Sequence, residues 1–205
     1  ESAINGSARW IKRAFDIILA SLTLLLIWPA LLIVAIAIKL DSPGPIIFKQ
    51  TRVGENGRPF TMYKFRTMRD GAEKQLDQLI EHTPEGKLIH KKPDDPRVTR
   101  LGRFLRRSSF DEWPQLINIL KGEMSWVGPR PELPFVVEQY ESWQRRRLSV
   151  PPGLTGWWQI SGRSDKPMHL HTEDDLYYIQ NYSLMLDLHI LIKTVSVVLR
   201  GRGAF

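Results

Sequence analysis

The sequence predicts an α+β protein, in which a membrane-embedded re-entrant helical hairpin precedes a mostly helical cytosolic domain with a small β-hairpin. Three observations support this. Residues 17–38 are an uncharged apolar run, an Asn-Gly pair separates two alternating segments, and apolar residues recur at helical spacing in most of the remainder. We expect residues 1–11 to be a linker, residues 12–40 to form the membrane hairpin and residues 41–205 to form one domain.

The composition narrows the classes of partner. The 205 residues carry a formal net charge of +7, which favours an anionic partner such as nucleic acid, anionic lipid or a phosphorylated substrate. The chain has no cysteine, which excludes disulfide bonds and thiolate chemistry within it. Because it begins with Glu1 and a linker-like stretch, we expect it to be part of a longer protein.

Three arrangements compete for the apolar run. Its 22 residues would form a helix of about 33 Å, long enough for a hydrocarbon core of about 30 Å. Pro29 interrupts the run and leaves segments of 12 and 9 residues, neither of which spans alone. Cations before the run (Lys12, Arg13) and after it (Lys39) favour the same side for both ends. A hairpin within one leaflet fits both facts, whereas a kinked transmembrane helix and a buried soluble helix are the alternatives.

A turn at residues 41–45 leads into the predicted β-hairpin. Residues 46–53 and 58–67 read as strands around Asn56-Gly57, a strong hairpin signal. In the second strand, aromatic and basic residues alternate, so Lys64 and Arg66 share the face opposite the rings. Beyond it, residues 72–81 predict a short amphipathic helix and residues 83–96 a Pro-rich surface loop.

The most informative stretch is residues 97–131. Arginines recur every third or fourth residue from Arg97 to Arg107, which predicts an amphipathic helix with a basic face. The adjacent carboxylates Asp111 and Glu112 follow, just before another apolar helical pattern that Gly122 ends. Two registers compete for this second helix start. A capping box from Ser109 to Glu112 is one, and Asp111 as N-cap is the register we favour, because it leaves Pro114 in the first turn.

Arg130 lies between two prolines in Gly128-Pro129-Arg130-Pro131, which fixes the backbone on both sides of its guanidinium. A capping box and a solvated basic face would explain each part of this stretch separately. Together, however, a carboxylate pair among arginines is what a site for Mg²⁺ and a diphosphate requires. We therefore expect residues 41–205 to be a catalytic domain centred on Asp111 and Glu112.

The C-terminal third predicts further helices. Residues 135–148 form an amphipathic pattern that ends in Arg145-Arg146-Arg147 beside Trp143, which is typical of a membrane interface. Residues 150–163 predict a turn and a short strand with exposed tryptophans, and the pair His169 and His171 is a weak metal signal. Thr172 begins a helix that carries Asp175, and Ser183 or Asp187 begins an apolar last helix that runs to Arg200.

Several ordered motifs resemble the bacterial sugar transferases, the monotopic polyprenyl-phosphate phosphoglycosyl transferases. The motifs extend from Arg13 to Ala204 and read KRAFD, DSPGPIIFKQTRVG, YKFRTM, RRSSFDEWPQLINILKGEMSWVGPRPE, PPGLTGWWQISGR and LDLHILIKTVSVVLRGRGA. The resemblance implies a transferase at the cytoplasmic face of the bacterial inner membrane that begins exopolysaccharide, capsule or O-antigen assembly. It would move a sugar-1-phosphate from a UDP-sugar to undecaprenyl phosphate and release UMP.

The resemblance also assigns roles to residues. It implies Mg²⁺ at Asp111 and Glu112, a covalent aspartyl-phosphosugar intermediate on Asp111, and a monotopic re-entrant hairpin that breaks at Pro29. Among the substrate- and phosphate-binding residues we place Lys64, Arg66, Arg106, Arg130, Arg163 and Asp175. Residues 71–96 are an insert relative to small family members, and the larger members carry additional N-terminal transmembrane helices.

Two other function classes would explain part of the sequence. A membrane-anchored nucleic-acid binder would explain the charge but not the carboxylate pair, and it predicts strongly salt-dependent DNA binding. A non-catalytic membrane scaffold would explain the hairpin, but it would tolerate Asp111→Asn. We expect no nucleic-acid partner, and we leave a homo-oligomer and the identity of the hexose open.

Overall fold

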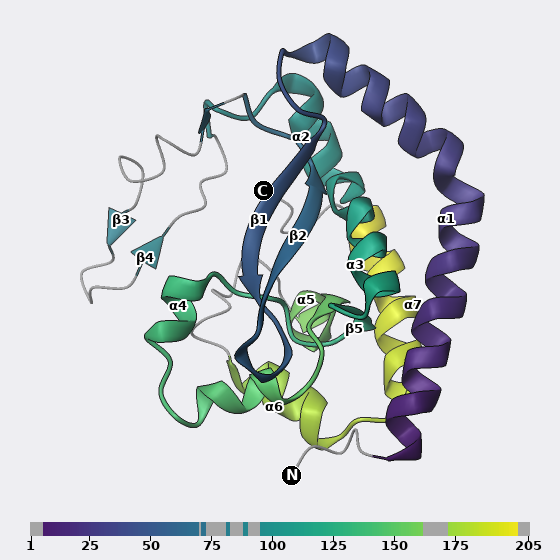
Figure 1. The fold of residues 1–205 in the computed structure, drawn as a ribbon, viewed down its shortest axis with the longest axis vertical. Helices are drawn as coiled ribbons and strands as arrows, with labels where there is room; N and C mark the ends of the chain where they lie inside the picture. Colours follow the sequence, from purple (N-terminus) through teal and green to yellow (C-terminus); the bar gives the residue numbers. More distant parts are fainter. Residues whose placement is uncertain are drawn as a thin grey trace.

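The computed structural model describes residues 6–69, 71–72, 81–82, 88–89, 95–161 and 172–200. A long N-terminal helix flanks a body of short helices and three two-stranded sheets, as Figure 1 shows. The N-terminal part of the chain contains α1 (Ser7–Asp41), β1 (Ile47–Val53), η1 (Glu55–Gly57), β2 (Pro59–Phe65), β3 (Glu81–His82) and β4 (Leu88–Ile89). The remainder contains α2 (Arg100–Arg107), η3 (Phe110–Gln115), α3 (Leu116–Lys121), β5 (Ser125–Val127), α4 (Pro134–Glu138), η4 (Gln144–Ser149), β6 (Gly153–Thr155), α5 (Trp157–Ser161), α6 (Thr172–Gln180) and α7 (Leu184–Arg200).

Helix α1 runs without interruption through Pro29, so its hydrogen-bonded course is not divided there; that the helix forms a re-entrant hairpin in a membrane stays a prediction. One face of α1 packs against the body on both sides of the proline. Ala20 belongs to one apolar cluster and Ile38 to another, and this packing maintains the helix where a backbone hydrogen bond is lost. The helix also begins at Ser7, which places residues 7–11 of the predicted linker inside it.

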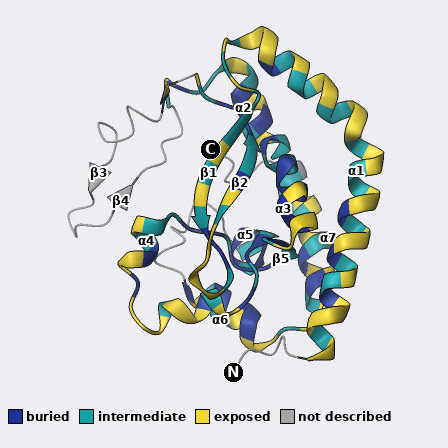
Figure 2. Cartoon of the chain, viewed as in Figure 1, coloured by how far each residue is buried: buried dark blue, intermediate teal, exposed yellow. Residues whose placement is uncertain are grey.

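The outer face of α1 is exposed along its length (Figure 2). By length and composition the helix could cross a membrane, and only 6% of its most apolar 18-residue window is buried within the protein. A core helix of a soluble protein would be mostly buried, so this apolar surface needs another apolar environment.

Polar contacts hold both ends of α1 to the body. Near the N-terminus, Lys12 Nζ lies 2.7 Å from Asp187 Oδ2 of α7, and both side chains are buried. One turn later, Asp16 accepts a hydrogen bond from the backbone N–H of Trp126 at 3.0 Å. At the C-terminal end, the buried Arg66 guanidinium donates to the carbonyls of Ser42 and Pro43 at 2.6 and 2.7 Å.

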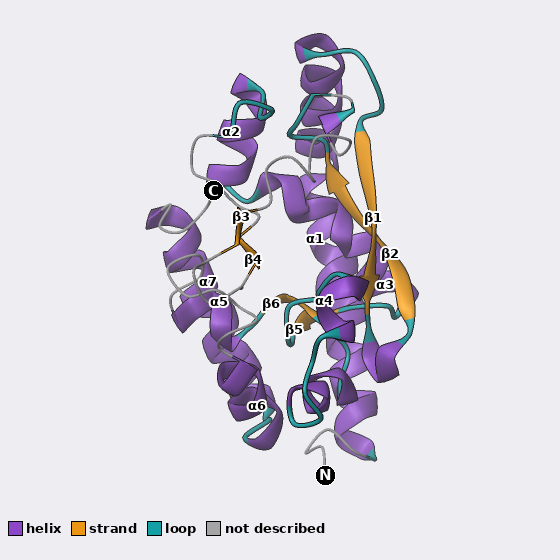
Figure 3. Ribbon diagram, turned by 90° about the vertical axis from the view of Figure 1, so that its left-hand side faces the viewer, coloured by secondary structure: helices purple, strands orange, loops and turns teal. Residues whose placement is uncertain are grey.

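The β1–β2 hairpin was predicted correctly. The strands are antiparallel with Phe48 opposite Lys64, and the connection has positive φ at Asn56 (55°) and Gly57 (76°), as an Asn-Gly turn requires. Figure 3 shows the parallel pair β5–β6 between this hairpin and α7. At that pair, a Cβ on Gly153 would lie 2.1 Å from the backbone nitrogen of Gly128, so the close approach of the two backbones requires glycine.

Two other predicted segments differ from the structure. The helix predicted at residues 135–148 is divided into α4 and η4. Residues 150–163 contain the predicted short strand as β6, but the tryptophans lie in the short helix α5, in which Trp158 is buried. The helix predicted at residues 72–81, the loop at 83–96 and the His169–His171 pair lie wholly or mostly outside the described residues. By contrast, α7 begins where predicted, because Ser183 Oγ accepts the N–H of Leu186 at 3.1 Å.

Candidate active site

Asp111 and Glu112 lie in a 3₁₀ turn rather than at the start of an α-helix. Ser109 has a left-handed backbone (φ 58°) and no side-chain cap, so both predicted capping registers are wrong. Pro114 has no N–H to continue a ladder, and the regular helix α3 begins only at Leu116, ending at Gly122 (φ 84°) as predicted. Neither acidic side chain is therefore used to cap a helix, and both are available for other contacts.

Asn118 positions this turn against β2. Its side-chain oxygen accepts the backbone N–H of Tyr63 at 3.1 Å, and its side-chain nitrogen donates to the carbonyl of Thr61 at 2.7 Å. The amide thus satisfies the free edge of β2 in the way a neighbouring strand would. Asn118 is completely buried, and it fixes the position of η3 and α3 relative to Lys64. The sequence reasoning missed this residue.

Glu112 forms ion pairs with Lys64 and Arg130. Its Oε1 lies 2.8 Å from Lys64 Nζ and 2.5 Å from Arg130 Nη2, and its Oε2 accepts a 3.3 Å hydrogen bond from Arg130 Nη1. Burial acts to raise the pKa of Glu112, but the charges and hydrogen bonds of Arg130 and Lys64 outweigh it and hold this pKa well below its usual value. Glu112 is therefore a fixed anion between two cations.

Asp111 has a different environment, although it is the adjacent residue. Its side chain is buried, with 8% exposure, and makes no hydrogen bond or ion pair with the described part of the chain. Burial and the neighbouring charge of Glu112 raise its pKa to about 6, against opposing effects of Lys64, Arg106 and Arg130. Near neutral pH, Asp111 is thus mostly an ionised carboxylate whose oxygens have no partner among the described residues, the state that a nucleophile requires.

This raised pKa predicts that Asp111→Asn stabilises the protein at neutral pH. A carboxyl group whose pKa rises on folding stabilises the folded state while it is protonated, and that contribution is lost as the pH rises from about 4 to about 6. Removing the ionisation should therefore raise the free energy of unfolding by about 1–3 kcal/mol at pH 7, and by nothing at pH 4. Unfolding scans at the two pH values, with the exposed Asp41→Asn as control, measure this. Equal or lower stability of the variant at pH 7 would contradict the result.

Arg106 reaches the site from the C-terminal turn of α2. Its Nε donates to Thr67 Oγ1 at 3.0 Å, and its charge acts on Asp111. Helix α2 approaches the backbone at Thr67 closely, because a Cβ on Gly102 would lie 2.0 Å from the Thr67 carbonyl oxygen. Gly102 therefore permits the packing that brings Arg106 towards the carboxylates.

The loop of residues 128–132 presents Arg130 and is held by backbone hydrogen bonds on both sides. Gly128 N donates to Thr155 O at 2.9 Å, and Gly153 N donates to Pro129 O at 2.8 Å. From the opposite side, Val53 N donates to Glu132 O at 2.9 Å. Arg52, which the sequence reasoning also missed, donates to Pro131 O at 3.2 Å. Four of the predicted residues (Lys64, Arg106, Asp111 and Glu112) therefore converge with Arg130.

Other predicted residues lie elsewhere. Arg66 follows the end of β2, and its guanidinium is bound to backbone oxygens at the C-terminal end of α1 rather than directed at the carboxylates. Asp175 is buried in α6, with its Oδ2 2.5 Å from Arg147 Nη2, so its connection to the site is indirect. Arg163 lies outside the described residues. Arg147, predicted at a membrane interface, is 2% exposed and was missed as part of the site.

The donor set of this site suits a hard divalent cation that arrives with a phosphorylated ligand. The carboxylate oxygens of Asp111 have no hydrogen bond or ion pair within the described part of the chain, whereas those of Glu112 are shared with two cations. The described residues include no group of three or more His, Cys, Asp or Glu side chains that could enclose a metal. Mg²⁺ is commonly bound by one or two carboxylates plus substrate phosphates, and this arrangement fits that pattern.

Comparison with known proteins identifies the family. The profile of the family described as "Bacterial sugar transferase" matches residues 7–201. The chain belongs to the bacterial sugar transferase family. As the sequence resemblance predicted, this is a family of transferases, and Asp111, Glu112 and Arg130 all lie in the matched range.

Among other members of the bacterial sugar transferase family, the UDP-glucose:undecaprenyl-phosphate glucose-1-phosphate transferase of Escherichia coli is 44% identical over 100% of this chain and 44% of its own length. The undecaprenyl-phosphate galactose phosphotransferase of Salmonella typhimurium is 40% identical over 97% of this chain and 42% of its own. The exopolysaccharide production protein ExoY of Sinorhizobium fredii is 42% identical, over 95% of this chain and 88% of its own. The chain thus spans less than half of the longer relatives and most of ExoY.

Proposed function

We propose that this chain transfers a sugar-1-phosphate from a UDP-hexose to undecaprenyl phosphate, giving undecaprenyl-diphospho-sugar and UMP, at the first membrane step of surface polysaccharide assembly. The observation that carries the proposal is the contrast between adjacent carboxylates. Asp111 is buried, unpaired within the described chain and surrounded by cationic charge, whereas Glu112 is fixed by Lys64 and Arg130. The names of relatives that act on undecaprenyl phosphate, with glucose or galactose, support the same substrate class.

The reaction consists of two displacements at one phosphorus atom. In the first, an Asp111 carboxylate oxygen attacks the phosphorus that carries the sugar; the bond from that phosphorus to the bridging oxygen breaks, and UMP leaves with the electron pair. In the second, an oxygen of the lipid phosphate attacks the same phosphorus, and the bond to Asp111 breaks and restores the carboxylate. No proton has to be transferred in either step, and UMP can leave before the lipid phosphate reacts.

The cationic residues have separate parts in this scheme. Arg130 and Lys64, which hold Glu112 here, supply charge-assisted hydrogen bonds to the diphosphate, and Arg106 adds positive charge beside Asp111. Glu112 keeps the two cations in place before the substrate binds. Mg²⁺ held by Asp111, Glu112 and the diphosphate would neutralise charge on the leaving UMP.

The test of this function is UMP release from a panel of UDP-hexoses with undecaprenyl phosphate and Mg²⁺. We expect sustained release of UMP with at least one UDP-hexose. Without the lipid, release should stop at no more than one UMP per protein molecule. Release of UDP in place of UMP, or no reaction with any UDP-hexose, would refute the proposal.

We also propose that α1 enters and leaves the membrane through the cytoplasmic leaflet. Lys12 and Ile38 are separated by about 39 Å along a helix of this length, more than the hydrocarbon core of about 30 Å. Lys12 is paired with Asp187, and Arg66 binds the chain just beyond Ile38, so both contacts belong to one packed body. A straight crossing would place them on opposite sides of the bilayer, which the body could not accommodate.

Cysteine labelling tests this topology in a chain that has no cysteine of its own. Ser7→Cys and Asp41→Cys introduce exposed thiols near the two ends of α1. In intact cells both thiols should be protected from a membrane-impermeant reagent, and after lysis both should react. Reaction of Ser7→Cys alone in intact cells would show that α1 crosses the bilayer.

A further inference from the structure

Arg147 is a buried arginine whose guanidinium joins three parts of the protein. It lies in η4, is 2% exposed, and its Nη2 is 2.5 Å from Asp175 Oδ2 of α6. The same nitrogen donates to the backbone carbonyl oxygen of Arg130 at 2.8 Å, and Nη1 donates to the hydroxyl of Tyr140. Moving two full charges from water into the interior costs free energy, and an ion pair offsets this cost only when its geometry is good. The burial of Arg147 and Asp175 therefore points to a role other than filling space.

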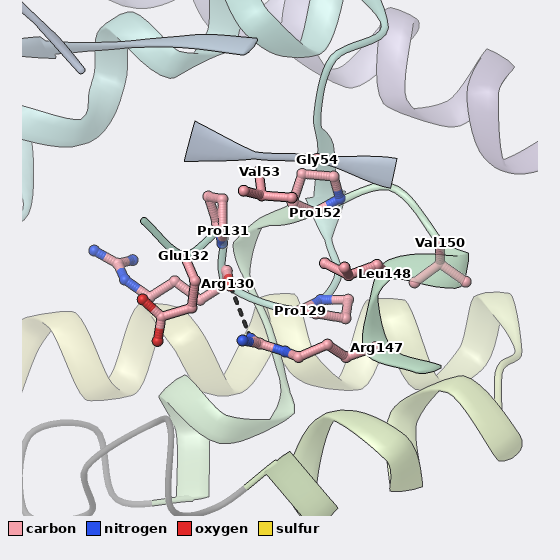
Figure 4. Close-up of a pocket in the computed structure, with 10 residues that line it drawn as sticks. All are labelled: Val53, Gly54, Pro129, Arg130, Pro131, Glu132, Arg147, Leu148, Val150 and Pro152. Carbon is pink, nitrogen blue, oxygen red and sulfur yellow. Dashed lines mark hydrogen bonds between the residues drawn. The ribbon is translucent and has the colours of Figure 1, made fainter. Parts of the chain in front are cut away.

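Arg147 contacts the main chain of Arg130, on the side of this residue opposite to the guanidinium that reaches the active site. In Figure 4 the side chain of Arg130 points away from Arg147, while its carbonyl oxygen points towards Arg147 along the dashed hydrogen bond. The side chain of Arg130 reaches Glu112, and its main chain is held from behind. Within the described residues, Arg147 is thus connected to Glu112 through Arg130.

The loop needs such a contact at this peptide. Pro129 and Pro131 restrict the backbone on either side of Arg130, but the orientation of the Arg130–Pro131 peptide still requires a donor for its carbonyl, and Pro131 has no N–H. Backbone or β1 donors hold the neighbouring carbonyls of Pro129, Pro131 and Glu132. The Arg130 carbonyl is held instead by the side chain of Arg147, which is fully buried and paired with Asp175.

We propose that Arg147 is a positioning residue, which fixes the Arg130 peptide so that the Arg130 guanidinium meets Glu112 and the donor diphosphate. Asp175 then acts indirectly: it holds Arg147, which holds Arg130, and it does not contact the substrate. The inference rests on the proposed function, because it assigns Arg130 to the diphosphate. Small displacements of a positioned group are enough to cost about 100-fold in rate, so a backbone contact can matter strongly.

A double-mutant cycle with Arg147→Lys and Arg130→Lys tests this. Lysine at 147 can still pair with Asp175, but it lacks the fork that reaches Tyr140 and the Arg130 carbonyl as well. We expect Arg147→Lys alone to lower kcat/KM for UMP release about 10- to 100-fold. In the Arg130→Lys background, the same change should lower it by about threefold or less, because the group that Arg147 positions is already absent.

The matched control is Arg97→Lys. Arg97 is also buried and ion-paired, with Asp95, but its remaining hydrogen bond goes to the Ala72 carbonyl and not to the 128–132 loop. If Arg97→Lys lowers kcat/KM, it should do so by the same factor in the wild-type protein and in the Arg130→Lys background. Equal losses from Arg147→Lys in both backgrounds would show that Arg147 only supports the fold, and would overturn the inference.

Asp175→Asn provides a second variant if Arg147→Lys does not fold. An amide oxygen can still accept a hydrogen bond from Arg147, and we expect a loss of about 3- to 30-fold that again largely disappears in the Arg130→Lys background. A loss that persists there overturns the indirect role of Asp175. The wild-type protein separates the two proposals: if it releases no UMP, the function fails, whereas if it does and the cycles are additive, only the positioning role fails.

Discussion

Asp111→Asn is expected to lower UMP release by a factor on the order of 10⁴–10⁶, because an amide cannot form the bond to phosphorus on which both displacements depend. The substitution keeps the size of the side chain, and the raised pKa of Asp111 predicts a protein that is more stable at neutral pH rather than less. Loss of turnover would therefore accompany a gain in stability. Kinetic and unfolding measurements on the same preparation establish both.

The control for this prediction is Asp41→Asn, which removes an exposed carboxylate of the same type and should leave the rate unchanged. Retention of more than about a tenth of the wild-type rate by Asp111→Asn would mean that another group attacks the phosphorus. Glu112, fixed by two cations, would then be the first alternative to examine.

Arg130→Lys is expected to lower kcat/KM about 100-fold while the fold persists. Arg130 makes two hydrogen bonds to the two oxygens of Glu112, a paired geometry that one ammonium group cannot reproduce on a carboxylate or on a phosphate. The loss of one preorganised donor commonly costs about 10²–10³ in rate. The positive charge is retained, so a loss of this size would come from geometry and not from charge.

Arg103→Lys is the matched control, since Arg103 is an exposed arginine of α2. It should leave kcat/KM within about twofold of the wild-type value. Equal rates for Arg130→Lys and the wild-type protein would remove Arg130 from the phosphate-binding group. The inference that Arg147 positions Arg130 for the diphosphate would then fail as well.

Local signals predicted the parts of this fold that depend on neighbouring residues. Asn56-Gly57 specified the β1–β2 hairpin, Gly122 ended α3, and Ser183 began α7, because each acts on backbone groups within a few residues of itself. The carboxylate pair and Arg130 were found in the same way, since a Pro-Arg-Pro loop and adjacent acids are visible in the sequence.

Long-range pairing decided what the sequence could not predict. The run Arg145–Arg147 resembles an interfacial basic cluster, but Asp175 neutralises its last member in the interior, from 28 residues further along the chain. Arg66 alternates with Lys64 as in a strand, yet β2 ends at Phe65 and the Arg66 guanidinium turns to the carbonyls that follow α1. The sequence carries no local signal for Asn118, because its amide joins α3 to the edge of a strand that is more than 50 residues earlier in the chain.

The central claim is a covalent intermediate on Asp111, and mass spectrometry of the intact and digested protein tests it most directly. The protein is mixed with a UDP-hexose that it uses, without the lipid acceptor, and the reaction is then quenched. The account predicts one added hexose phosphate on the peptide that contains Asp111, absent in Asp111→Asn and removed when undecaprenyl phosphate is supplied before the quench. An adduct on any other residue, or no adduct together with UMP release that requires both substrates at once, would contradict it.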